Sequence, residues 1–279
     1  MVVMALLSFI VIALMTVFNS TQAAFRASVT QTDVLESGRA AMELITDDLR
    51  AISPSLGFSN VVINGNSYNG PVNFYAGTNN YFNPPLIQTL VASSGSRTNV
   101  QQDIFILSRG NLNGVPTWTG TGYAVCLSLS NTYSLYRFAT NRPVAQYLSA
   151  SNLFYGDFQN FRVTPNNGSY SHLLDGVVGF RVQTFDANGG LILTNRTNIR
   201  TNAAPPSIVF YSNALPASVE IELATIEDRT LQRAESRPGD LPALPPGDSR
   251  TKYLQDQGGK VHVFRQRVAI PNVDPSVYK

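Results

Sequence analysis

MVVMALLSFIVIALMTVF, residues 1–18, opens the chain with a run that contains no charge, glycine or proline, and whose only polar members are Ser8 and Thr16. As an α-helix this run would extend about 27 Å, just short of the roughly 30 Å hydrocarbon core of a bilayer. The run therefore predicts a transmembrane segment over residues 1–18. The residues expected to face lipid or neighbouring helices are Met1, Ala5, Leu6, Leu7, Phe9, Ile10, Val11, Ile12, Leu14, Val17 and Phe18.

A cleaved secretory signal is the alternative interpretation, because Gln22-Ala23-Ala24 resembles a small-residue cleavage site. Two observations weigh against it. No basic segment precedes the apolar run, and the helical pattern continues beyond the point where the hydrophobicity ends.

The helical pattern extends to Ile52, with no proline between Ala23 and Ile52 and Gly38 as the only glycine. Apolar or small residues recur there at spacings of three and four, which predicts one buried face of a helix. This head-docking stripe consists of Val34, Leu35, Gly38, Ala41, Met42, Ile45, Leu49 and Ile52. Because Pro54 disfavours helix at Ser53, we expect one helix of about fifty residues, roughly 75–80 Å long. It is apolar over 1–18 and amphipathic over 19–53.

Residues 54–279 have the composition of a β-rich head domain, with many Gly, Pro, Asn, Ser and Thr residues. We expect residues 54–101 to form loops with one or two short strands, as around Val61–Ile63. Strands are predicted over 103–108, 123–129, 134–138, 158–163, 177–185, 191–194, 218–226 and 261–270, with turns at 130–132 and 186–190, a short helix over 227–237 and a proline-rich loop over 241–246. The predicted fold class is α+β: a long N-terminal helix packed on a mostly antiparallel head.

The segment VLESGRAAMELITDDLR (34–50) resembles the (E/S)-x-G-R-x-A-x-x-x-[LI]-x-x-D-L-R segment of PilW-like minor pilins. Residues 173–189 and 215–223 are similar to later strands of the same proteins and of the J-type minor pseudopilins of type II secretion. The resemblance implies a structural subunit that assembles through its N-terminal helix into a type IV pilus or a pseudopilus. It also implies a single-pass inner-membrane protein with its head on the periplasmic or outer side.

Members of this family begin with a basic leader, a glycine at the cleavage site and Phe-Thr-Leu-x-Glu, and none of these is present. Met1 would align just after that glutamate. We therefore expect the true reading frame to start several residues upstream, and we infer neither peptidase processing nor N-terminal methylation.

The composition argues against several other classes of function. Charged residues make up 14% of the chain and the net charge is +2, which disfavours a nucleic-acid binder that neutralises phosphates. The single cysteine, Cys126, within an apolar run, excludes an intramolecular disulfide framework, and His172 and His262 lie far apart in the sequence. We expect no catalytic residue, cofactor, metal or small-molecule substrate, and we expect other pilin-like subunits and the inner membrane as partners.

Two groups of polar residues resemble functional sites but have simpler structural explanations. Asp186, Asn188 and Gly190 resemble a calcium loop, but the twelfth position from Asp186 is Thr197 instead of the bidentate glutamate of an EF-hand. A hairpin turn explains the same residues.

The helix carries a second such group, because Asp47 and Asp48 follow Glu43 near its end. Adjacent helical residues point about 100° apart, so these carboxylates are expected on a solvated face or against an arginine of the head. Arg39 and Arg50 are candidates for salt bridges between subunits.

Two other classes of function remain as alternatives. A membrane-tethered periplasmic binding or adhesive domain acting alone could use Tyr68, Tyr75, Tyr81 and Trp118 as stacking platforms for glycans, although packing explains these aromatics equally well. A hydrolase that uses scattered carboxylates is the least favoured hypothesis, since the chain contains no local catalytic motif.

Overall fold

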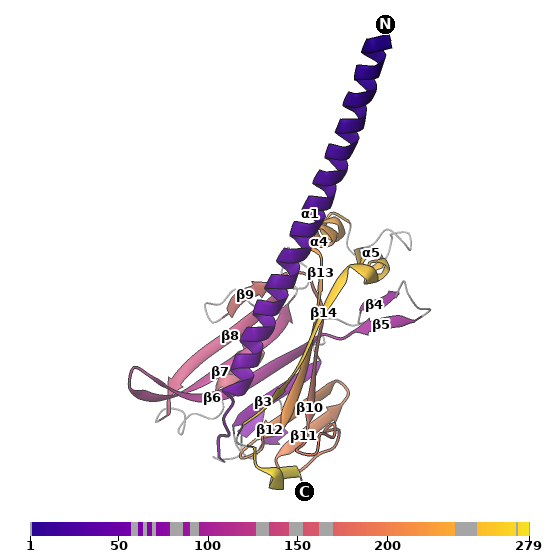
Figure 1. Ribbon diagram of the computed structural model, residues 1–279. Coiled ribbons are helices and arrows are strands. Elements are labelled where there is room, and N and C mark those ends of the chain that lie inside the picture. Colours follow the sequence, from indigo (N-terminus) through magenta and orange to yellow (C-terminus); the bar gives the residue numbers. More distant parts are fainter. Residues whose placement is uncertain are drawn as a thin grey trace.

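Helix α1 (Val2–Arg50) runs unbroken through 49 residues in the computed structural model. Its N-terminal part projects far from the head, and the C-terminus lies at the opposite end of the molecule (Figure 1). The helix ends three residues before the predicted boundary. Ile52 then forms an antiparallel bridge with Ser108, and the Ser53 amide donates to the Leu107 carbonyl oxygen at 3.0 Å. The structure describes residues 2–56, 61–63, 66–68, 71–78, 86–89, 95–126, 134–144, 153–161, 170–237, 250–271 and 273–278.

Across its described residues, the head forms two antiparallel sheets and two short strand pairs. The larger sheet has the order β11 (Ile199–Ala203), β12 (Pro206–Tyr211), β3 (Val72–Thr78), β6 (Gln102–Leu112), β7 (Val115–Cys126), β8 (Ser134–Pro143), β9 (Tyr170–Leu174). The smaller sheet has the order β10 (Val177–Phe185), β13 (Ser218–Ile226), β14 (Val261–Ala269). The pairs are β1 (Val61–Ile63) with β2 (Asn66–Tyr68), and β4 (Leu86–Thr89) with β5 (Ser96–Asn99). The predicted α+β class is confirmed.

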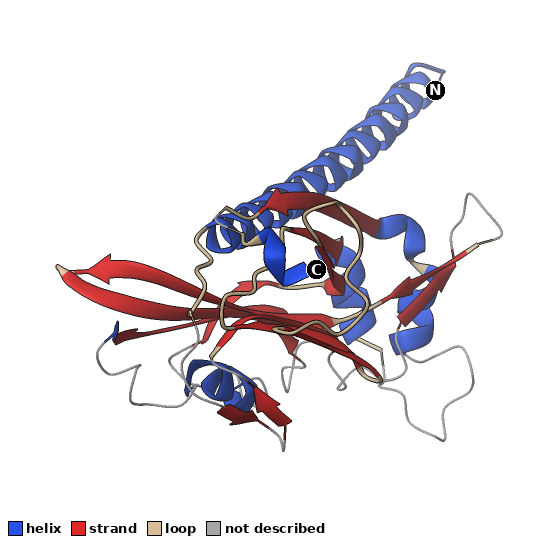
Figure 2. Ribbon diagram, turned by 90° about the horizontal axis from the view of Figure 1, so that it is seen from below, coloured by secondary structure: helices blue, strands red, loops and turns tan. Residues whose placement is uncertain are grey.

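The described part of the head also contains three short helices and two 3-10 turns. They are α3 (Leu153–Phe161), α4 (Asp228–Glu235) and α5 (Arg250–Asp256), with the turns at Gly258–Lys260 and Pro275–Tyr278. The larger sheet lies between α1 on one side and α3 on the other (Figure 2).

The main core is enclosed by α1 and the inner faces of both sheets. Strand β6 shows how the sequence divides its side chains between two layers. Ile104 and Ile106 join the main core, whereas Phe105 and Leu107 join a second cluster beneath α3. This division follows from the two-residue period of a strand, and it requires a strand that is apolar on both faces.

Strand β13 is half buried in the way its alternation predicts. Val219, Ile221 and Leu223 lie in the main core, while Glu220 and Glu222 on the other face pair with arginines of β14 and β5. Further along, the outer face is covered as well, because Ala224 and Ile226 pack in a third cluster with α4 and α5.

Most predicted strands are present with shifted ends. Strands β1, β10 and β13 have the predicted bounds, and β6, β8 and β14 overlap the predicted ranges with shifted ends. Strand β7 overlaps the prediction only over 123–126, because it begins at Val115, and α4 lies within the predicted short helix. Residues 127–129, the turn at 130–132 and the proline-rich loop 241–246 lie outside the described residues.

Two strand predictions were wrong. Residues 158–161 belong to helix α3, because Phe154, Tyr155 and Phe158 lie on one helical face that covers the larger sheet. Residues 191–194 form no strand either. The hairpin turn is present, but the pairing with β10 extends only through the Leu191 bridge to Phe185 and the hydrogen bond from the Ile192 amide to the Thr184 carbonyl oxygen.

The prediction that residues 54–101 form loops with one or two short strands was wrong in the number of strands, because the described part of this region supplies β1 to β5. This region supplies β3, a fully embedded strand of the larger sheet. Asn73 of β3 is a buried polar side chain that connects three backbone groups. Its Oδ1 accepts from the Ser55 amide at 3.0 Å, and its Nδ2 donates to the Ser212 and Ala214 carbonyl oxygens, both at 2.9 Å.

We predict that Ile45→Ala lowers the free energy of unfolding by about 3–4 kcal/mol, because it removes a fully buried side chain from the main core. Val29→Ala is the matched control, since Val29 is 44% exposed on the same helix and its truncation should cost under about 0.5 kcal/mol. Chemical denaturation of the detergent-solubilised protein, followed by circular dichroism, measures both. Equal losses would show that α1 is not docked through Ile45.

Candidate assembly helix and its junction with the head

The projecting part of α1 exposes apolar side chains on every side. Phe9 is 75% exposed and Phe18 is 61% exposed, and the side chains between them are similarly bare. Of the predicted membrane-segment residues, Leu7, Phe9, Ile10, Val11, Ile12, Leu14, Val17 and Phe18 are exposed in this way. Met1 and the side chains of Ala5 and Leu6 lie outside the described residues. By length and composition, α1 is the one helix of the described chain that is long and apolar enough to cross a membrane.

The head-docking stripe begins to be buried at Val34. Burial extends to nearly all of the stripe, with exposed fractions of 6% or less for Val34, Ala41, Met42, Ile45, Leu49 and Ile52. Gly38 is buried too and Leu35 is half-buried. The contact is shorter than the predicted 19–53, because the described side chains from Asn19 to Val29 are exposed.

Gly38 is a close-approach position for the head. The ring of Phe264 on β14 lies so near the helix backbone that a Cβ at Gly38 would overlap it. A residue without a side chain therefore lets β14 pack directly on α1, which explains why glycine interrupts an otherwise helix-favouring segment.

A polar lock fixes the end of the docked helix. Asp48 receives two hydrogen bonds from the Arg137 guanidinium on β8, Nε to Oδ2 at 2.9 Å and Nη2 to Oδ1 at 3.1 Å. The Tyr123 hydroxyl on β7 donates to the same Oδ2. The two charged side chains are 19% and 26% exposed, so the pair is screened far less than a surface ion pair.

The environment of this lock shifts the pKa values of Tyr123 and Arg137. Burial, followed by the charge of Asp48, raises the pKa of Tyr123 above its ordinary value, so the phenol stays neutral. Burial alone would lower the pKa of Arg137, but the hydrogen bonds and charge of Asp48 outweigh that effect and raise it. The lock therefore combines a neutral phenol with a bidentate Asp48–Arg137 ion pair.

The two neighbouring carboxylates of the helix have different environments. Asp47 points to solvent and pairs with Arg50 at 3.3 Å, with both side chains at least 60% exposed. The expected contact with an arginine of the head is confirmed for Asp48 alone. The sequence did not identify Arg137 or Tyr123, and the only local signal was a carboxylate directly beside the stripe residue Leu49.

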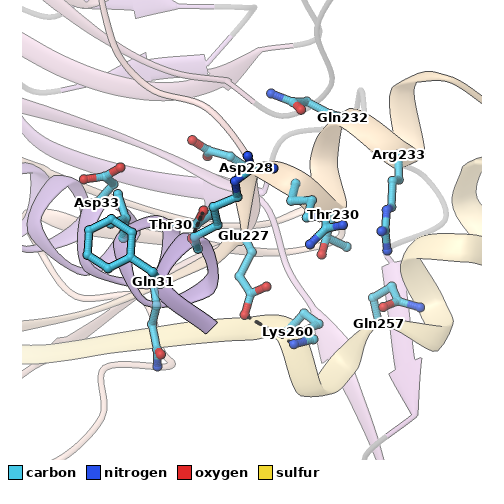
Figure 3. Close-up of a pocket in the computed structure, with 14 residues that line it drawn as sticks. Thr30, Gln31, Asp33, Glu227, Asp228, Thr230, Gln232, Arg233, Gln257 and Lys260 are labelled. Carbon is cyan, nitrogen blue, oxygen red and sulfur yellow. Dashed lines mark hydrogen bonds and ion pairs between the residues drawn. The ribbon is translucent and has the colours of Figure 1, made fainter. Parts of the chain in front are cut away.

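An open cleft of about 810 Å³ lies where α1 meets α4. Figure 3 shows Thr30 and Asp33 of α1 on one side and Arg233 of α4 on the other, with Glu227 joined to Lys260 below them. The Glu227–Lys260 ion pair spans 3.7 Å. Burial, then the charges of Asp175 and Asp33, raise the pKa of Asp228 in the same cleft.

Other residues considered from sequence have structural roles. Asp186 Oδ1 accepts from the amides of Asn188 at 2.9 Å and Gly190 at 2.7 Å, which organises the turn after β10. Tyr75 and Trp118 are at most 8% exposed, so neither offers a free stacking face.

Among the remaining sequence candidates, the two histidines that the structure describes have separate partners. The side chains of Tyr68, Tyr81 and Cys126 are outside the described residues. His172 hydrogen-bonds Asp175 at 2.8 Å, and His262 lies 3.7 Å from Glu227. Among the side chains that the structure describes, no three His, Cys, Asp or Glu residues gather as metal ligands.

Comparison with protein-family models, with curated proteins and with solved structures produced no match to this chain.

We predict that Asp48→Asn lowers the free energy of unfolding by about 2–3 kcal/mol, because it leaves Arg137 largely buried without a counter-charge. Asp47→Asn is the matched control one residue away, and removing its exposed pair should cost under about 0.5 kcal/mol. Thermal unfolding of the two variants measures the loss of stability at each position. Similar losses at both positions would contradict the lock.

Proposed function

We propose that this protein is a structural subunit of the minor pilin or minor pseudopilin kind, with no catalytic role. In this proposal the apolar part of α1 anchors the chain in the inner membrane, with the head on the periplasmic or outer side. The same part of α1 then packs among the helices of neighbouring subunits in a pilus or pseudopilus. The observation that carries the proposal is one unbroken helix that is bare and apolar in its first half and buried in its own head in its second half.

The exposed half of α1 supports this proposal on energetic grounds. Each large apolar side chain left in water forgoes about 1.5–3 kcal/mol that burial would supply. The run from Val3 to Phe18 exposes such side chains in every direction, so no single groove of the head could cover it. Lipid, or a ring of similar helices, covers a helix on all sides.

The docked half of α1 supports assembly over simple tethering. A tether needs only a flexible connection, whereas here the stripe, Gly38 and the Asp48–Arg137 pair hold the helix in one orientation on the head. A subunit whose head must occupy a defined place around a bundle of helices requires that rigidity. The alternative of a lone adhesive domain has less support, because Tyr75 and Trp118 are buried.

We predict that Ile10→Asp together with Leu14→Asp abolishes membrane retention. A carboxylate near the centre of a spanning helix costs about 2.5–3.5 kcal/mol, and two side chains one turn apart add to each other. The control places the same charges at Gln31 and Ala40, which are exposed beyond the apolar run. Cell fractionation with alkaline extraction measures retention, and an Ile10/Leu14 variant that stays in the membrane would refute the anchor.

We also predict that the full chain, extracted in mild detergent, copurifies with other proteins that carry an apolar N-terminal helix. The Ile10→Asp and Leu14→Asp variant should lose these partners, while Arg200→Gln, on an exposed strand at the far end of the head, should retain them. Mass spectrometry of the eluates identifies the partners. Recovery of the membrane-inserted protein alone would favour a solitary tethered domain.

A further inference from the structure

The α1–α4 cleft lies at the end of the head from which the apolar part of α1 emerges (Figure 1). The apolar run ends at Phe18, and Arg26 follows eight residues later, about 12 Å along the helix. The headgroup layer of a bilayer is about 5–8 Å thick on each side. If α1 crosses the membrane, the Arg26 backbone therefore stands about 4–7 Å beyond the headgroup layer, and the facing end of the head lies next to that layer.

Three arginines of this cleft are available to an external ligand. Arg26, Arg229 and Arg233 are exposed, and none of them forms an ion pair with another described residue. Arg229 and Arg233 are four residues apart on α4, so they share one face. The opposite face of α4 is fixed, because Thr230, Leu231 and Ala234 are buried against the head.

The carboxylates of the cleft only partly offset these charges. Glu227 is already engaged by Lys260 and lies equally close to His262. Asp33 and Asp228 remain, and the raised pKa of Asp228 makes this group easier to neutralise near an anionic surface. Three unpaired guanidinium groups thus face two carboxylates, those of Asp33 and Asp228.

We propose that Arg26, Arg229 and Arg233 bind the phosphate groups of anionic phospholipids and hold the α4 end of the head against the bilayer surface. This inference rests on the proposed membrane anchoring of α1. Guanidinium groups suit the role because they donate two parallel hydrogen bonds to a phosphate and keep their charge at any relevant pH. Because α1 is locked to the head, contact at α4 also sets the angle at which the whole subunit stands on the membrane.

The test measures the distance from α4 to the headgroups in reconstituted full-length protein. A donor fluorophore is attached at Gln232→Cys, between the two arginines, in a chain with Cys126→Ala, and the acceptor is a headgroup-labelled lipid. We expect more energy transfer in vesicles with 30% phosphatidylglycerol than in pure phosphatidylcholine vesicles. Each arginine near an anionic surface should shift the docked population by about fivefold at low ionic strength. Added salt should abolish the difference, and inorganic phosphate with phosphatidylcholine vesicles should not reproduce it.

Two controls make the result specific. Arg229→Gln with Arg233→Gln should remove most of the lipid dependence and leave only the share of Arg26, whereas Arg196→Gln with Arg200→Gln, exposed at the β11 end of the head, should leave it unchanged. A donor at Ala203→Cys on β11 should report no lipid dependence.

Flotation of the same samples separates the two proposals. If the protein floats with both kinds of vesicle but energy transfer ignores lipid charge, the headgroup contact is overturned and the anchor stands. If the protein does not float with either kind, the anchor fails and the headgroup contact fails with it.

Discussion

Helix α1 is one continuous helix that meets two different environments: its C-terminal part is docked on the head, and its N-terminal part projects away from it. Its C-terminal part is buried along a single stripe, so the rest of its circumference carries charges that remain in water. Its N-terminal part is apolar around the whole circumference and receives no cover from the head. Because the helix is unbroken, the head cannot fold back over the exposed part, and that surface requires a cover from outside the chain. The proposals on membrane anchoring and on subunit packing both derive from this constraint.

The head is organised to make the docking of α1 rigid. The stripe residues of α1 and the inner faces of both sheets form one core. The helix therefore cannot detach without exposing that core to water. The Asp48–Arg137 pair adds direction to this apolar contact, because hydrophobic burial tolerates sliding along the helix axis whereas a bidentate ion pair does not. Gly38 has a similar effect through shape, since only one helical turn admits the Phe264 ring. The projecting half therefore points in one direction relative to the head.

The places where sequence patterns misled share one physical cause. Asn73 is a loop-favouring residue when judged locally, yet in β3 its buried amide hydrogen-bonds three backbone groups of neighbouring segments. The aromatic residues around Phe158 favour a strand by propensity, yet the outer face of the larger sheet needs a cover that a helix supplies. In both cases long-range packing outweighed a local preference of about 1 kcal/mol or less.

The sequence by itself determined that a long helix exists, where it is apolar and which face of it is buried, because the 3.6-residue period of a helix is a local property. It also located β13 and β14 through their alternation or apolar content. Only the tertiary structure decided that contact with the head starts at Val34, that Asp48 is paired while Asp47 is not, and that the arginines of α4 stand beside Arg26. Such contacts join segments that are up to about two hundred residues apart, and no local pattern encodes which of them will meet.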